Sequence, residues 1–206
     1  MFDEVITTKE RLREIVGKPS HRMAGKSIDH IDDICRKYIA ASPYLVISTR
    51  GSDGLMDMSP KGDMAGFVHV IDEKTLIIPE RLGNKRADTF ENLMTNPEVG
   101  IIFLIPGFPY ILRVSGKGQV VRDQALQKMF IIKGKEPDLA TAITVDEAFV
   151  HCAKSIARSS IWKPESWPSN DDVPSYAVST VAHAALVETV EEMQTMIDDD
   201  FNTRMY

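Results

Sequence analysis

The chain has 206 residues, of which 43% are hydrophobic and 26% are charged, as in a globular protein of one or two domains. This apolar share excludes an intrinsically disordered chain, and no apolar run approaches the roughly 20 residues that cross a bilayer. The formal net charge of -6 argues against a protein that binds a nucleic acid backbone, because such proteins carry a basic excess.

The first part of the chain, residues 1–42, is predicted to be helical. Its opening residues mix acids and bases, unlike a secretory signal or a transit peptide, so we expect a cytoplasmic protein. One helix is expected over residues 8–16 and ends at Gly17. Ser27 is expected to cap a second helix, which the Ser-Pro pair at 42–43 terminates. The buried face of that helix carries apolar residues at helical spacing, namely Ile28, Ile31, Ile34, Cys35 and Tyr38.

The middle part, residues 43–122, is predicted to be mainly β. Apolar and β-branched runs alternate with turn signals, and strands are expected over 44–49, 55–59, 67–71, 75–79, 99–105 and 110–121. Only one helix, over residues 85–95, interrupts this set, and it ends before Pro97. Because a doubly wound sheet needs a helix between most strands, the six strands indicate an α+β fold built on a small antiparallel barrel.

The last part, residues 123–206, is predicted to be helical and to form one domain with the rest of the chain. Two T-x-x-E patterns have the form of a capping box, and they predict helices over residues 144–157 and 189–201. Between them, residues 161–168 hold two tryptophans and two prolines, so we expect an irregular aromatic loop there.

Most enzyme motifs are absent from the sequence. It contains neither the G-x-S-x-G nor the G-x-x-x-x-G-K-[ST] motif, and it has no H-E-x-x-H. The five histidines form no pair at i, i+4, and Cys35 and Cys152 lie too far apart to make a zinc cluster by themselves. No metal site is therefore predicted. Two reduced thiols are the simpler expectation for the cysteines, while a single disulfide stays open.

The most informative segment is R-L-G-N-K-R at residues 81–86, which follows an expected strand and opens an expected helix. Helix N–H groups and the helix dipole favour an anion at such a place. Cations are unfavourable there unless an anion lies among them, so the segment predicts a phosphate monoester site. The residues concerned are Arg81, Asn84, Lys85 and Arg86. A solvent-exposed basic turn is the alternative.

A second segment, D-M-S-P-K-G-D at residues 57–63, follows an earlier strand. Its serine, lysine and backbone groups can form hydrogen bonds to a planar polar ligand. A plain β-turn is the alternative. In the predicted meander, this segment and the basic segment close neighbouring strands. We therefore expect the two to line one groove.

The order of these motifs resembles a known family. Along residues 59–118 the chain contains S-P-K-G-D, G-F-V, I-P-x-R-x-G-N-x-R, N-P-x-V-G-I-I-F-L-I-P-G and L-R-V-S-G-K-G in turn. The series resembles the FMN-binding split β-barrel proteins related to pyridoxamine 5'-phosphate oxidase, above all the PPOX-class FMN-dependent proteins. The resemblance covers residues 43–123 well and continues weakly to Trp162.

The resemblance implies a six-stranded split barrel and a homodimer with two FMN sites between the subunits. The family's phosphate-binding turn falls on Arg81, Asn84, Lys85 and Arg86. The strand beside the flavin ring falls on Met58, Ser59, Pro60 and Lys61, with the ribityl chain or ring against Ile78 and Pro79. Further candidates are Arg113 and, from the second subunit, His151 and Trp162.

The same resemblance implies a flavin-dependent oxidoreductase that acts on an unidentified small molecule. True pyridoxamine phosphate oxidases end in an Arg- and Trp-rich segment, whereas this chain ends in an acidic helix, so we expect a different substrate. No side chain stands out as a catalytic base. The alternatives are a non-catalytic protein that holds a flavin, haem or deazaflavin on the same barrel, and a structural dimer with an empty groove.

Overall fold

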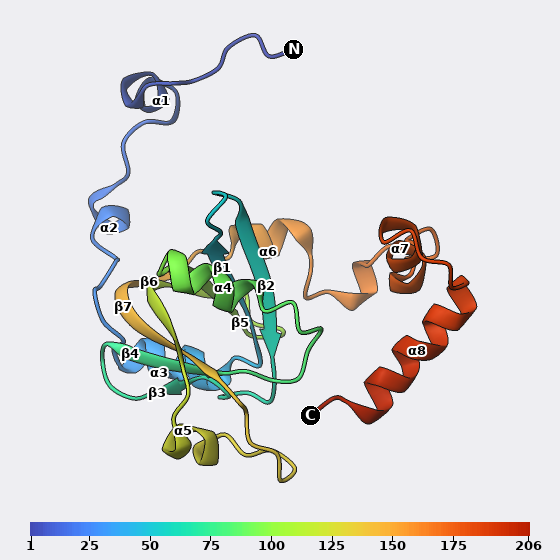
Figure 1. Ribbon diagram of the computed structural model, residues 1–206. Helices are drawn as coiled ribbons and strands as arrows, with labels where there is room; N and C mark the ends of the chain where they lie inside the picture. The colour runs from blue at the N-terminus through green and yellow to red at the C-terminus, as the bar shows by residue number, and fades with distance from the viewer.

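The computed structural model describes all 206 residues as an α+β molecule with one antiparallel sheet (Figure 1). The strands are β1 (Tyr44–Arg50), β2 (Met56–Gly62), β3 (His69–Val70), β4 (Thr75–Pro79), β5 (Glu98–Leu104), β6 (Ile111–Val121) and β7 (Ala140–His151). The helices are α1 (Lys9–Val16), α2 (His21–Ala24), α3 (Asp33–Ala41), α4 (Asp88–Thr95), α5 (Gln124–Met129), α6 (Lys154–Ser159), α7 (Tyr176–His183) and α8 (Val190–Thr203), with a 3-10 turn η1 (Pro164–Ser166). None of the helices has the length and apolar character needed to span a membrane.

The strands pair in the order β2-β1-β5-β6-β7-β4-β3. All these pairings are antiparallel, and the three predicted hairpins β1–β2, β3–β4 and β5–β6 are confirmed. The α+β class is therefore confirmed. The sheet has seven strands instead of the expected six, and it stays open because no ladder joins β2 to β4 or β3.

The open sheet nevertheless curls, because β2 at one edge and β4 near the other meet at their ends. Lys61 at the end of β2 lies with its Nζ 2.9 Å from Oε2 of Glu80, the residue after β4. Nε of Arg81 lies 2.7 Å from Oδ2 of Asp63. Two segments that are five positions apart in the strand order thus face each other across one hollow.

The core lies inside this curled sheet. The strands contribute fully buried apolar side chains at alternate positions, as in Leu45, Phe103, Leu112 and Ile143. Burying each such side chain contributes roughly 1.5–3 kcal/mol, so this cluster supplies most of the stability of the fold. Helix α3 packs on this core with Cys35 and Ile39, and Ile31, just before the helix, is buried beside them.

The predicted helix over residues 144–157 is wrong for most of its length, because residues 140–151 form β7 and the helix α6 begins only at Lys154. Ser115 pairs with Glu147 and Gly116 with Val145, so a bulge leaves Asp146 without a partner. The bulge puts two polar residues in succession and breaks the alternation that marks a strand. Gly116 is required opposite the bulge, since a Cβ there would lie 2.0 Å from the carbonyl oxygen of Thr144.

The expected start of the second helix is also wrong. Ile28 exchanges backbone hydrogen bonds of 3.0 and 2.7 Å with Ala148 of β7, so this part of the chain is extended. Helix α3 begins later and is capped by Asp32, whose carboxylate accepts a bond of 2.7 Å from the backbone N–H of Cys35. The buried apolar face of the helix is therefore shorter than predicted, and Ile34, which was expected to be part of it, is exposed.

The two ends of the chain lie outside the sheet (Figure 1). Every residue from 1 to 25 is exposed, and helix α1, which ends at Gly17 as predicted, has no buried residue. The predicted capping box of the last helix is confirmed, since Thr189 and Glu192 bond each other's backbone N–H groups. The expected aromatic loop is likewise irregular and holds only the turn η1.

Candidate functional site

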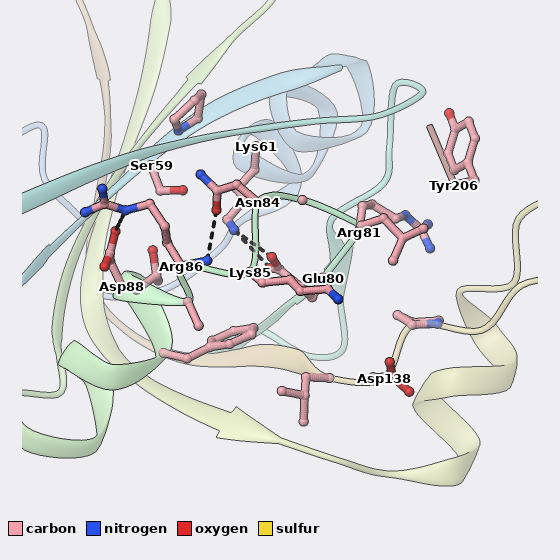
Figure 2. A pocket seen from close by; sticks show the side chains of 18 of the residues that line it. Ser59, Lys61, Glu80, Arg81, Asn84, Lys85, Arg86, Asp88, Asp138 and Tyr206 are labelled. Atoms are coloured by element: carbon pink, nitrogen blue, oxygen red, sulfur yellow. Dashed lines mark hydrogen bonds and ion pairs between the residues drawn. The ribbon is translucent and has the colours of Figure 1, made fainter. Parts of the chain in front are cut away.

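A cavity of about 600 Å³ lies where the two sides of the curled sheet meet (Figure 2). Its walls come from five parts of the chain: β2, the loop between β4 and α4, the first turn of α4, the segment 132–139, and Tyr206. The volume is in the range typical of small-molecule sites. The two sequence segments that we expected to share a groove, residues 57–63 and 81–86, therefore do contribute to one cavity. They reach it from strands that are not neighbours.

The loop between β4 and α4 begins with two residues that are tied to β2. Glu80 receives two hydrogen bonds from the Nζ of Lys61, at 3.2 and 2.9 Å. Arg81 donates from Nε to Asp63 at 2.7 Å and from Nη1 to the carbonyl of Phe130 at 2.8 Å. The Asp63 side chain is 0% exposed, so this ion pair is held away from water. Arg81 thus lines the cavity with only Nη2 left without a protein partner.

The second half of the loop is open. Asn84 accepts a hydrogen bond of 3.0 Å from the backbone N–H of Arg86, which folds the loop back on itself. Arg86 pairs through Nε with Asp88 at 2.7 Å, which raises the pKa of its guanidinium, but its side chain is 72% exposed. Lys85 has no ion-pair partner. These side chains leave donors free towards the cavity.

Helix α4 begins at Asp88, three residues later than predicted. Ala87 precedes it in a left-handed conformation, and no side chain caps the helix. Lys85 is left-handed too, with φ of 61° against 57° for Ala87. Non-glycine residues in this region are strained, and such strain gathers at functional sites. The cations therefore lie in a strained loop in front of the helix, while the first turn carries Asp88 and Glu91.

The expected flavin-ring strand lies along the cavity. All four of its predicted residues, Met58, Ser59, Pro60 and Lys61, line the wall. The alternation of β2 leaves Met58 exposed, whereas Ser59 and Lys61 lie on the half-buried face. Asp57, on that same face, accepts a hydrogen bond of 3.2 Å from the hydroxyl of Thr89 and so joins β2 to α4.

Five predicted residues lie away from this cavity. Ile78 is in the core and Pro79 is buried in β4, beside Ala140 of β7. Arg113 lies over the ring of Phe149 at 5.0 Å and lines a smaller hollow of about 240 Å³ on the other face of the sheet. His151 ends β7 with a buried Nδ1 that has no partner. Trp162 donates to the carbonyl of Phe108 at 3.0 Å.

The wall opposite the basic loop was not predicted from the sequence. Asp138 and Tyr206 line it (Figure 2), and the phenol of Tyr206 donates to Asp63 at 3.2 Å. The negative charge of Asp63 raises the pKa of Tyr206. No local motif marks these residues, because they come from segments far along the chain. Asp63 itself stands in the S-P-K-G-D motif, which could have indicated it.

The fold and the cavity define a split-barrel protein of the pyridoxamine 5'-phosphate oxidase type. A family model described as pyridoxamine 5'-phosphate oxidase matches residues 31–152, from the start of the core to the end of the sheet. This match covers more than half of the chain. The chain therefore belongs to that family, as the motif order predicted. No curated protein matches the sequence.

The chain is also similar to several solved structures. HupZ of Group A Streptococcus is 19% identical, with a TM-score of 0.50 over 60% of this chain and 95% of its own. HutZ, the heme storage protein from Vibrio cholerae, is 13% identical, with a TM-score of 0.42 over 59% and 94%. An F420 reductase is 20% identical, with a TM-score of 0.40 over 56% and 94%. At these identities, the likeness to HupZ concerns the fold alone.

Proposed function

We propose that this protein binds FMN in the cavity and is a flavin-dependent oxidoreductase that acts on a small molecule. The observation that carries the proposal is the strained, open half of the loop, where Lys85, Arg86 and the amide of Asn84 stand at the mouth of the cavity. Left-handed backbone at two non-glycine positions, Lys85 and Ala87, costs free energy that a bound anion can offset.

The donor set suits the phosphate of FMN. Asn84, Lys85 and Arg86 would hold the phosphate, in front of a helix whose first N–H groups have no side-chain cap. Met58–Lys61 would run beside the ring system. Bound there, FMN would supply the redox step, and the protein would supply binding and orientation. The side chain of Lys61 is already paired with Glu80, so we assign it a supporting place in the wall and no separate charge for the ligand.

The test is a binding titration with FMN, followed by absorbance and fluorescence. The double variant Asn84→Ala, Arg86→Ala should weaken FMN binding by roughly 2–5 kcal/mol, because in this proposal both residues would share one phosphate that is desolvated when FMN binds. Arg122→Ala is the matched control, since this exposed arginine lies outside the cavity. An unchanged Kd for FMN in the double variant would remove the site from this loop.

A passive flavin holder is separated from an oxidoreductase by a second experiment. Addition of NADH or NADPH to the FMN-bound protein in the absence of oxygen should bleach the flavin absorbance if the protein is a reductase. If the flavin absorbance persists with both donors, and if the photoreduced flavin is not reoxidised by air, a passive flavin-binding protein is favoured. Haem has less support, because neither His69 nor His151 lines the cavity.

We further propose a homodimer with the two FMN sites between the subunits. Support comes from the sheet surface next to the cavity, where Met58 is exposed and shared with the second hollow. The apolar Val46, Ile102 and Phe149 also line that hollow. Light scattering coupled to size-exclusion chromatography gives the mass directly, and a monomer at micromolar concentration would contradict the proposal.

A further inference from the structure

The wall of the cavity away from the basic loop contains a side chain from the segment that follows α8. Tyr206 stands beside Arg81, whereas Ser59 and Arg86 lie at the other side (Figure 2). The residues around Tyr206 do not belong to a helix or strand, and helix α8 has no buried residue. Tyr206 is therefore placed at the cavity by its own contacts and not by the packing of the helix before it.

Three contacts hold Tyr206 in place. Its hydroxyl donates to Oδ1 of the buried Asp63 at 3.2 Å, and the other oxygen of that carboxylate already accepts from Arg81. Its carbonyl oxygen accepts a hydrogen bond from the Nζ of Lys135. The Nζ of Lys133 lies 4.8 Å from the centre of its ring. The phenol is thus bonded to the same carboxylate that joins the two ends of the sheet.

These contacts are few, and each is individually weak because Tyr206 itself is only half-buried. The chain before Tyr206 adds little, because Met205 is exposed and Arg204 pairs only with Asp200, within the same segment. A few weak contacts must offset the conformational entropy of ordering this segment. Tyr206 can therefore leave its docked position by thermal motion while the sheet stays folded.

We propose that Tyr206 is a gate residue of the cavity: docked on Asp63 it closes the side away from the basic loop, and it must leave before a ligand enters or departs there. This inference depends on the proposed function in one respect: it takes FMN as the ligand. The compartment it encloses, between Tyr206, Arg81 and Asp138, is the space into which the rest of FMN would extend from a phosphate held by the basic loop.

The experiment measures the association and dissociation rates of FMN by stopped flow. Tyr206→Phe removes only the hydroxyl, so both rates should rise about 3–10-fold. Tyr206→Ala also removes the ring, and both rates should rise about 10–100-fold with a smaller change in Kd. Tyr176→Ala is the matched control, because this tyrosine is 70% exposed on α7 and does not line the cavity.

A change in the dissociation rate alone would mean that Tyr206 is a direct ligand contact, and it would overturn the gate. So would rates equal to those of the control. If the wild-type protein binds no FMN, the proposed function fails, and the gate is then read from amide hydrogen exchange. The backbone bonds between Ile132 and Lys135 should open faster in Tyr206→Ala than in Tyr176→Ala; equal exchange in the two variants overturns the gate.

Discussion

The loop between β4 and α4, which forms one wall of the cavity, has two halves. Both carry charged side chains, but the halves differ in burial and in ion pairing. The first half, Glu80 and Arg81, is paired with Lys61 and Asp63 across the gap between the two sheet ends. The second half is exposed, and its one ion pair, between Arg86 and Asp88, links residues two positions apart. The comparison shows that the presence of charged residues in a loop does not tell which of them stabilise the fold through ion pairs and which are free to bind a ligand.

The largest expected effect is in the first half. Asp63→Ala should lower the free energy of unfolding by about 3–5 kcal/mol, because it leaves the 18% exposed Arg81 as an uncompensated, mostly buried charge. Chemical denaturation followed by circular dichroism measures it. A loss below about 1 kcal/mol would show that water reaches this ion pair and that the two halves of the loop do not differ.

Glu80→Gln should give an intermediate effect. Its pair with Lys61 is partly exposed, at 31% and 19%, and the neutral amide can keep one hydrogen bond to the ammonium. We expect a loss of about 1–2 kcal/mol in the free energy of unfolding, which is the range of a single charge-assisted hydrogen bond. The same denaturation experiment with Lys61→Met as partner in a double-mutant cycle isolates the pair.

Asp88→Ala should have the smallest effect on stability in this series. The partner Arg86 is largely in water, so the free energy of unfolding should fall by less than about 1 kcal/mol, and raised salt should reduce even that difference. Thermal denaturation at low and high salt provides the measurement. A loss as large as that of Asp63→Ala would contradict the division of the loop into an anchored and an open half.

The same contrast between buried and exposed groups predicts the behaviour of the two thiols without any mutation. Burial raises the pKa of the Cys35 thiol to about 12, so its reactive thiolate is not populated at pH 8. Cys152 is exposed, and both cysteines are free. Titration of the native protein with a thiol reagent should therefore modify one cysteine, and addition of denaturant should release the second.

Local signals predicted much of the fold. The first helix ends at Gly17, the last begins with the Thr189 capping box, and the three hairpins follow their turn residues. These features depend on contacts within a few residues. The strand β7 was missed for the opposite reason: the bulge at Asp146 breaks the alternation of apolar residues, and only its partners on β6 and β4 show that the segment is extended.

The candidate site divides in the same way. Residues 58–61 and 84–86 were indicated by their composition and by the motif order, and the structure brings both groups to one cavity. Whether Arg81 belongs with Arg86 could not be read from their spacing, since Asp63 and the carbonyl of Phe130 come from other parts of the chain. Tyr206 has no signal of its own, because only its distant partners place it at the cavity.

The sequence by itself determined the α+β class, the family, the strand hairpins and the basic loop, because these depend on short patterns and on the order of motifs. The tertiary structure alone decided which charges are held in ion pairs and which face the cavity. That outcome depends on the curl of an open sheet, which brings the ends of β2 and β4 together although five positions separate them in the strand order. Such contacts between distant segments leave no local trace in the chain.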